Sequence, residues 1–141
     1  MPDKETLPFI IQTKLNRPSL PADIVHRPRL TKWLKRHQGR PLTLVSAPAG
    51  YGKSTLISCW VSSTSWPSAW VSLDQYDSRL DHFLGYLLAA IQTIYPNALR
   101  ETQTFLTVTQ QPSIADIART FIYELCQIEE PFILVLDDYH L

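Results

Sequence analysis

The feature that most constrains the fold is a glycine-containing segment of eight residues, followed by Thr55. Its sequence is Ala47-Pro48-Ala49-Gly50-Tyr51-Gly52-Lys53-Ser54. An apolar run at residues 41–46 precedes it, and apolar residues at helical spacing follow it. Glycines allow backbone N–H groups to surround clustered anionic oxygens, and the start of a helix adds further N–H groups. The pattern therefore predicts a phosphate-binding loop between a strand and a helix.

Each residue type at the end of this loop has a chemical role. The Lys53 ammonium is suited to the β- and γ-phosphates of ATP, and the Ser54 hydroxyl to a magnesium ion. Ala47 stands where the pattern has its first glycine, and we interpret it as a variant. The alternative is a structural glycine turn with an exposed lysine. We favour the phosphate loop because the strand and the helix that it requires are both expected.

A second signal is an apolar run that ends in two carboxylates. Residues 132–136 are Phe-Ile-Leu-Val-Leu, and Asp137 and Asp138 follow. A carboxylate at the end of a buried strand is the usual partner of a nucleotide-bound Mg²⁺. We assign Asp137 to the metal, and Asp138 as the candidate catalytic residue that orients and deprotonates a water molecule. The alternative for both is a strand-end turn.

Alternating strands and helices predict an α/β fold of the P-loop NTPase type, with three α/β/α layers and a parallel sheet. We expect strands at 41–46, 69–73 and 132–136, the first of them buried on both faces. We expect helices at about 29–37, from 54, at 79–95 and at 113–127, with a short helix and a loop in 98–111. Ser78 with Asp81 and Ser113 with Asp116 have the spacing of helix caps. Residues 1–40 form an extended leader and a first helix flanking the nucleotide site, and 41–141 form the N-terminal part of an ATPase domain.

Composition narrows the functional classes only slightly. The 141 residues are 45% hydrophobic, and 13 basic residues balance 13 acidic ones, so net charge gives no argument for a nucleic-acid or membrane partner. No signal-peptide core or membrane-spanning run occurs, and we expect a cytoplasmic protein. A basic cluster precedes the loop, at Arg27, Arg29, Lys32, Lys35, Arg36 and Arg40. We favour a solvated helix face for it and leave a DNA-contacting helix open. Trp33 is expected in the core.

With these motifs in place, the chain resembles the N-terminal ATPase domain of MalT-like, LuxR-type transcriptional activators, which belong to the STAND class of P-loop ATPases. Ala-Pro-Ala-Gly at 47–50 and Asp-Asp-Tyr-His at 137–140 are distinctive for that group. Matching segments also include Thr13-Lys14-Leu15, residues 25–30 and residues 69–74.

The resemblance implies an ATP-dependent switch that binds ATP or ADP with Mg²⁺ and hydrolyses ATP slowly, if at all. Such proteins self-associate and bind DNA through a C-terminal helix-turn-helix that these residues do not include. Val25 and Arg27 match the segment that lies beside adenine. In that class a further strand follows the acidic strand, so we expect an incomplete fold, truncated after residues 132–136. Two alternatives remain, an inactive truncated fragment and a small P-loop kinase.

Overall fold

The computed structural model describes Leu7 and residues 10–139, which divide into two compact units. Unit 1 combines the N-terminal residues up to Asn16 with the chain from Ser68 onward. Unit 2 is the intervening segment, Arg17 to Pro67. Unit 2 is therefore an insertion in the sequence of unit 1, and the chain passes between the units twice.

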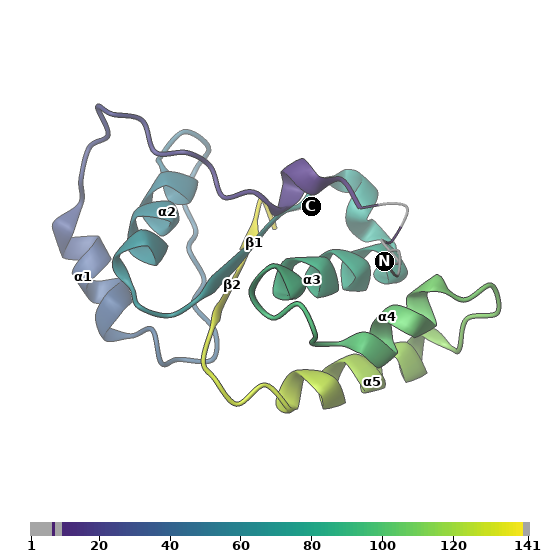
Figure 1. The fold of residues 1–141 in the computed structure, drawn as a ribbon. Coiled ribbons are helices and arrows are strands. Elements are labelled where there is room, and N and C mark those ends of the chain that lie inside the picture. The colour runs from purple at the N-terminus through teal and green to yellow at the C-terminus, as the bar shows by residue number, and fades with distance from the viewer. Residues whose placement is uncertain (1–6, 8–9, 140–141) are drawn as a thin grey trace. The chain divides into compact units, whose positions relative to one another are not determined.

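Unit 1 is built on two parallel strands, β1 (Ser68–Ser72) and β2 (Ile133–Asp137). Ser68 pairs with Ile133 and Ser72 with Asp137, so both strands end at one edge of the sheet. Figure 1 shows them side by side, although about sixty residues separate them in the sequence. The parallel pair confirms an α/β fold and the two strands predicted at 69–73 and 132–136.

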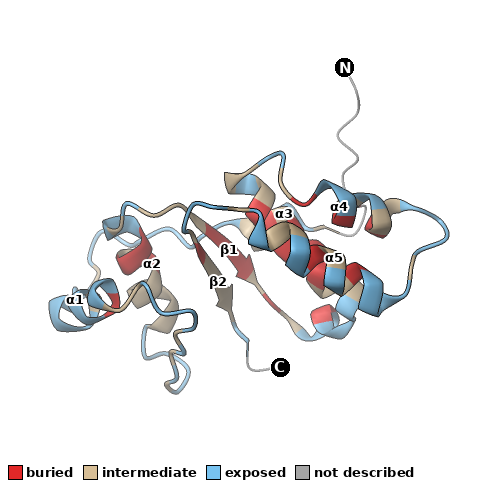
Figure 2. Ribbon diagram, turned by 90° about the horizontal axis from the view of Figure 1, so that it is seen from below, coloured by how far each residue is buried: buried red, intermediate tan, exposed pale blue. Residues whose placement is uncertain are grey.

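Three helices complete the core of unit 1: α3 (Leu80–Ile94), α4 (Arg100–Thr107) and α5 (Ile114–Cys126). The middle of helix α3 is buried (Figure 2). Its residues Leu88, Ala90 and Ile91 are almost inaccessible to solvent. Helix α5 begins where the sequence predicts, because the Ser113 side chain accepts a hydrogen bond from the backbone N–H of Asp116. All three helices confirm the predicted amphipathic segments.

The start of α4 is held by a side chain from α5. The Glu124 carboxylate accepts hydrogen bonds from the backbone N–H groups of Glu101 and Thr102, at 3.0 and 2.9 Å, and from the Thr102 hydroxyl. These bonds satisfy donors that a helix leaves unpaired in its first turn. Glu124 therefore joins the two helices without any cap in the sequence of α4 itself.

The N-terminal residues attach to unit 1 through a short 3-10 helix, η1 (Gln12–Leu15), which packs against β1. Lys14 Nζ lies 2.7 Å from an Asp74 carboxylate oxygen and 2.8 Å from one of Asp77, and 4.9 Å from the Tyr86 ring centre. Both aspartates belong to the turn η2 (Gln75–Ser78) and its N-cap. The predicted extended leader is thus fixed by a charged cluster that sequence spacing did not indicate.

The capping prediction for α3 was wrong. Ser78 forms no cap, and Arg79 precedes the helix, with its guanidinium bound to the Asp81 carboxylate. The capping box lies four residues earlier, where Asp74 and Asp77 reciprocally bond backbone N–H groups in η2. The reason is that a separate 3-10 turn intervenes between β1 and α3.

Unit 2 contains α1 (Pro28–Arg36), α2 (Lys53–Ser63) and the chain between them. The strand predicted at 41–46 is wrong. This segment forms no ladder within the described residues, and Leu42 and Leu44 are each 82% exposed. The sheet accordingly has two strands rather than three. A β-strand is stabilised by hydrogen bonds to a neighbouring strand, and an apolar sequence alone does not provide that neighbour.

Candidate functional site

The loop at 47–52 has the backbone that its glycines predict. Gly50 has φ +83° and Gly52 has φ +76°, both in the left-handed region that L side chains rarely adopt. Gly52 is also the N-cap of α2, and its carbonyl accepts the first helical bond, from Leu56, at 2.9 Å. The chain therefore turns sharply into α2, and the start of α2 faces the loop. The first turn of α2 contains no acidic residue.

Lys53 folds back over the loop that precedes it. Its Nζ donates to the carbonyl oxygen of Ala47 at 2.6 Å and to that of Pro48 at 3.2 Å. The ammonium thus lies across the start of the loop rather than in open solvent. A positive charge and the positive end of a helix dipole are both directed at the same small region, which favours an anion there.

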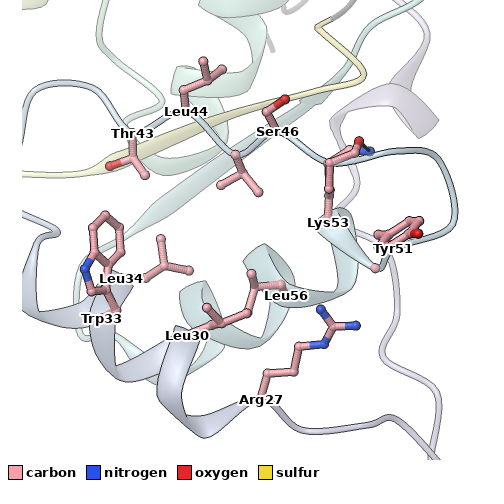
Figure 3. Close-up of a pocket in the computed structure, with 13 residues that line it drawn as sticks. Arg27, Leu30, Trp33, Leu34, Thr43, Leu44, Ser46, Tyr51, Lys53 and Leu56 are labelled. Atoms are coloured by element: carbon pink, nitrogen blue, oxygen red, sulfur yellow. Dashed lines mark hydrogen bonds between the residues drawn. The ribbon is translucent and has the colours of Figure 1, made fainter.

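This region opens into a pocket of about 300 Å³ within unit 2. Three parts of the chain line it: the start and inner face of α1, the extended segment at 43–47, and the loop with the beginning of α2 (Figure 3). The lining residues are Arg27, Leu30, Trp33, Leu34, Thr43, Leu44, Val45, Ser46, Ala47, Tyr51, Gly52, Lys53 and Leu56. This lining includes two cations and no carboxylate, beside several apolar side chains. It suits an anion that carries a flat or apolar group.

The pocket brings together only part of the predicted adenine side. Arg27 lines the pocket, and its side chain extends toward the end where Lys53 and Tyr51 lie (Figure 3). Val25 is 80% exposed and is not among the lining residues. Within the loop, Pro48, Ala49 and Gly50 are exposed, whereas Ser54 and Thr55 are half-buried in the first turn of α2.

Sequence reasoning missed the α1 wall of this pocket. Leu30, Trp33 and Leu34 recur at helical spacing, which predicts an apolar face without saying what it packs against. Trp33 was expected in the core, but it is 51% exposed, and its ring lies 4.4 Å from that of His37. Trp60 and Trp70, by contrast, are buried.

The predicted acidic residues lie in unit 1, at the carboxyl edge of the sheet. The Asp137 backbone carbonyl accepts a bond from Leu73 N–H, and its Oδ1 accepts one from Asp138 N–H, each at 3.0 Å. Asp138 is exposed and has φ +59°, a left-handed conformation that aspartate tolerates better than most residues. The chain thus turns immediately after β2 and presents Asp138 to solvent.

The described part of the chain contains neither a cluster of metal ligands nor a membrane-spanning helix. No group of three or more histidine, cysteine, aspartate or glutamate side chains is arranged to hold a metal ion there. Among the same residues, no helix has the length and apolar character needed to span a membrane.

Comparison with known proteins shows strong similarity to a named transcriptional regulator. The chain is 36% identical over 133 residues to the HTH-type transcriptional regulator MalT of Klebsiella pneumoniae subsp. pneumoniae, and equally to that of a second Klebsiella pneumoniae strain. The match covers 94% of this chain but 15% of each relative. The chain is therefore homologous to a limited part of MalT. No protein-family model matches it.

Proposed function

We propose that this chain is the ATP-binding part of a MalT-like transcriptional regulator of the STAND class, acting as an ATP-dependent switch. The observation that carries the proposal is the loop at 47–54, with two left-handed glycines, Lys53 folded over it and α2 beginning behind it. These are the features with which a backbone holds the phosphates of a nucleotide.

In this proposal the loop residues and Thr55 bind the phosphates, and Lys53 changes partners. Its bonds to the Ala47 and Pro48 carbonyls are exchanged for, or shared with, the β- and γ-phosphate oxygens. Arg27 adds a second positive charge to the same pocket. Val25 and Arg27 are assigned to the adenine side because of the family resemblance. Leu30 and Leu34 supply apolar surface for the base or ribose.

In the same proposal, the sequence motifs name the Ser54 hydroxyl and the Asp137 carboxylate as the groups that would ligate magnesium, together with phosphate and water oxygens. The chemistry of the ion there is to neutralise phosphate charge. Asp138, exposed in the turn after β2, is the candidate that orients an attacking water. Self-association and DNA binding through a helix-turn-helix are assigned to the whole regulator, of which MalT is the named relative.

The first prediction tests the loop directly. Saturating Mg-ATP, at one hundred times its dissociation constant, raises the free energy of unfolding of unit 2, which contains the loop, by about 2.7 kcal/mol because only the folded state binds it. We expect Lys53→Ala to abolish this gain, since phosphate charge then has no ammonium partner. A thermal melt of the full chain with and without Mg-ATP measures it.

Lys35→Ala is the matched control, because Lys35 is exposed on α1 and does not line the pocket. It should retain the stabilisation. An unchanged nucleotide effect in Lys53→Ala, or no effect of Mg-ATP on a cooperatively melting wild type, would overturn the proposal.

A further inference from the structure

The balanced charge of the chain hides an unequal distribution between the two units. Residues 17–67 contain eight lysine and arginine residues and one acidic residue, Asp23. The remaining residues, which make up unit 1, contain five lysine and arginine residues and twelve acidic residues. Unit 2 therefore has a formal charge of +7 and unit 1 of −7. Most of the positive charge lies on or next to α1.

The cations of α1 lie on a different face from the one that lines the pocket. Leu30, Trp33 and Leu34 line the pocket. Arg29, Lys32 and Arg36 recur at spacings of three and four, so they share another face of the same helix. All three are exposed, as is the neighbouring Lys35. We call these four residues of α1 the basic face. Its charges are directed away from the nucleotide site and are not needed there.

No described residue neutralises the basic face. The ion pairs among the described residues involve Lys14, Arg79 and Arg119, and none includes a cation of α1. Close like charges on a short helix repel one another, and a bound polyanion would relieve this repulsion.

We propose that the basic face of α1 is a sequence-independent contact surface for the sugar–phosphate backbone of a nucleic acid. A helix with cations along one face and no acidic residue is the electrostatic footprint of phosphate binding. This surface is separate from the phosphate loop, and its occupation does not depend on the nucleotide.

The test is fluorescence anisotropy of a labelled, random-sequence DNA duplex titrated with the full chain between 50 and 200 mM salt. Each phosphate contact contributes about −0.9 to the slope of log K against log salt, so four contacts weaken binding by roughly 100-fold over this range. Lys32→Gln with Arg36→Gln removes two contacts. The loss over the same range should fall to about tenfold, with weaker binding at 50 mM salt.

The matched control removes two exposed helix cations from unit 1, with Arg100→Gln and Arg119→Gln. It should keep the wild-type slope. Equal slopes in the two double variants, or no binding by the wild type at 50 mM salt, would overturn the proposal. Displacement of the duplex by polyglutamate as effectively as by unlabelled DNA of equal charge would overturn it too, in favour of an acidic protein partner.

Discussion

At the scale of single residues, two glycines determine the shape of the candidate site. A Cβ on Gly52 would meet no heavy atom within 4 Å, so its conformation, and not crowding, excludes a side chain. The site is therefore preformed by backbone preference. The space left around the two glycines is open to a ligand, because no side chain fills it.

Gly52→Ala tests this preformed conformation. Holding an L-residue at φ +76° costs about 1 kcal/mol, so we expect the free energy of unfolding to fall by that amount. Gly39→Ala is the control, because Gly39 also has open space but no positive φ. Urea denaturation of both variants measures the difference. If Gly39→Ala and Gly52→Ala change the free energy of unfolding equally, the left-handed conformation of Gly52 makes no specific contribution to stability.

At the scale of elements, most features that depend on neighbouring residues were predicted correctly, and the Ser78 cap of α3 is the exception. The Ser113 cap, the apolar stripe of α3 and the glycine loop each depend on a few neighbouring residues, and all are found. The strand prediction for residues 41–46 failed because a strand must pair with another strand that can lie far away in the sequence. The prediction that Trp33 lies in the core failed for the same reason. Helical spacing shows that a helix face is apolar, but not which part of the protein packs against that face.

The cluster that holds η1 could not be predicted either, because Lys14 and Asp77 are 63 residues apart. Burial alone would lower the pKa of Lys14, but its bonds to Asp74 and Asp77 outweigh this effect and raise the pKa above the usual 10.5. The bond from Lys14, aided by the Tyr76 backbone N–H, lowers the pKa of the Asp74 carboxyl below the usual 3.8. Lys14 and Asp74 are therefore both charged, and stabilise each other, at pH values between 3.8 and 10.5.

These shifts predict how stability depends on pH. Asp74 stabilises the fold above its unfolded pKa of 3.8, and this contribution is lost as pH falls through its lower, folded pKa. Lys14 stabilises the fold below 10.5, and its contribution is lost as pH rises through its higher, folded pKa. Lys14→Met should reduce the loss of stability both at low pH and at high pH. It should also cost about 2 kcal/mol at neutral pH, because the buried Asp77 carboxylate loses its partner.

Chemical denaturation of Lys14→Met across the pH range measures both effects. Lys32→Met is the control, since Lys32 is an exposed lysine without an ion pair among the described residues. It should leave the pH profile unchanged. An unaltered profile in Lys14→Met would mean that the cluster is neutral in net stability, as some partly buried ion pairs are.

At the scale of the whole molecule, the two units differ in how much apolar surface they bury. Both hydrophobic clusters belong to unit 1 and contain residues of β1, α3, α4 and α5. In unit 2 only Leu34, Trp60 and Val61 are buried hydrophobic residues among those described. Because burial of apolar surface is the main stabilising contribution, unit 2 has the lower local stability. It is also the unit that contains the proposed phosphate loop.

This difference predicts where a nucleotide acts. In native-state hydrogen exchange, amides of α2 should exchange faster than those of α3, because unit 2 opens without unit 1. Mg-ATP at one hundred times its dissociation constant should slow α2 exchange by up to about 100-fold, since the open state has lost its ligand. The central amides of α3 should change less. Equal slowing in α2 and α3 would contradict this view, because it would show that both units unfold in one cooperative step and that the ligand stabilises the whole chain.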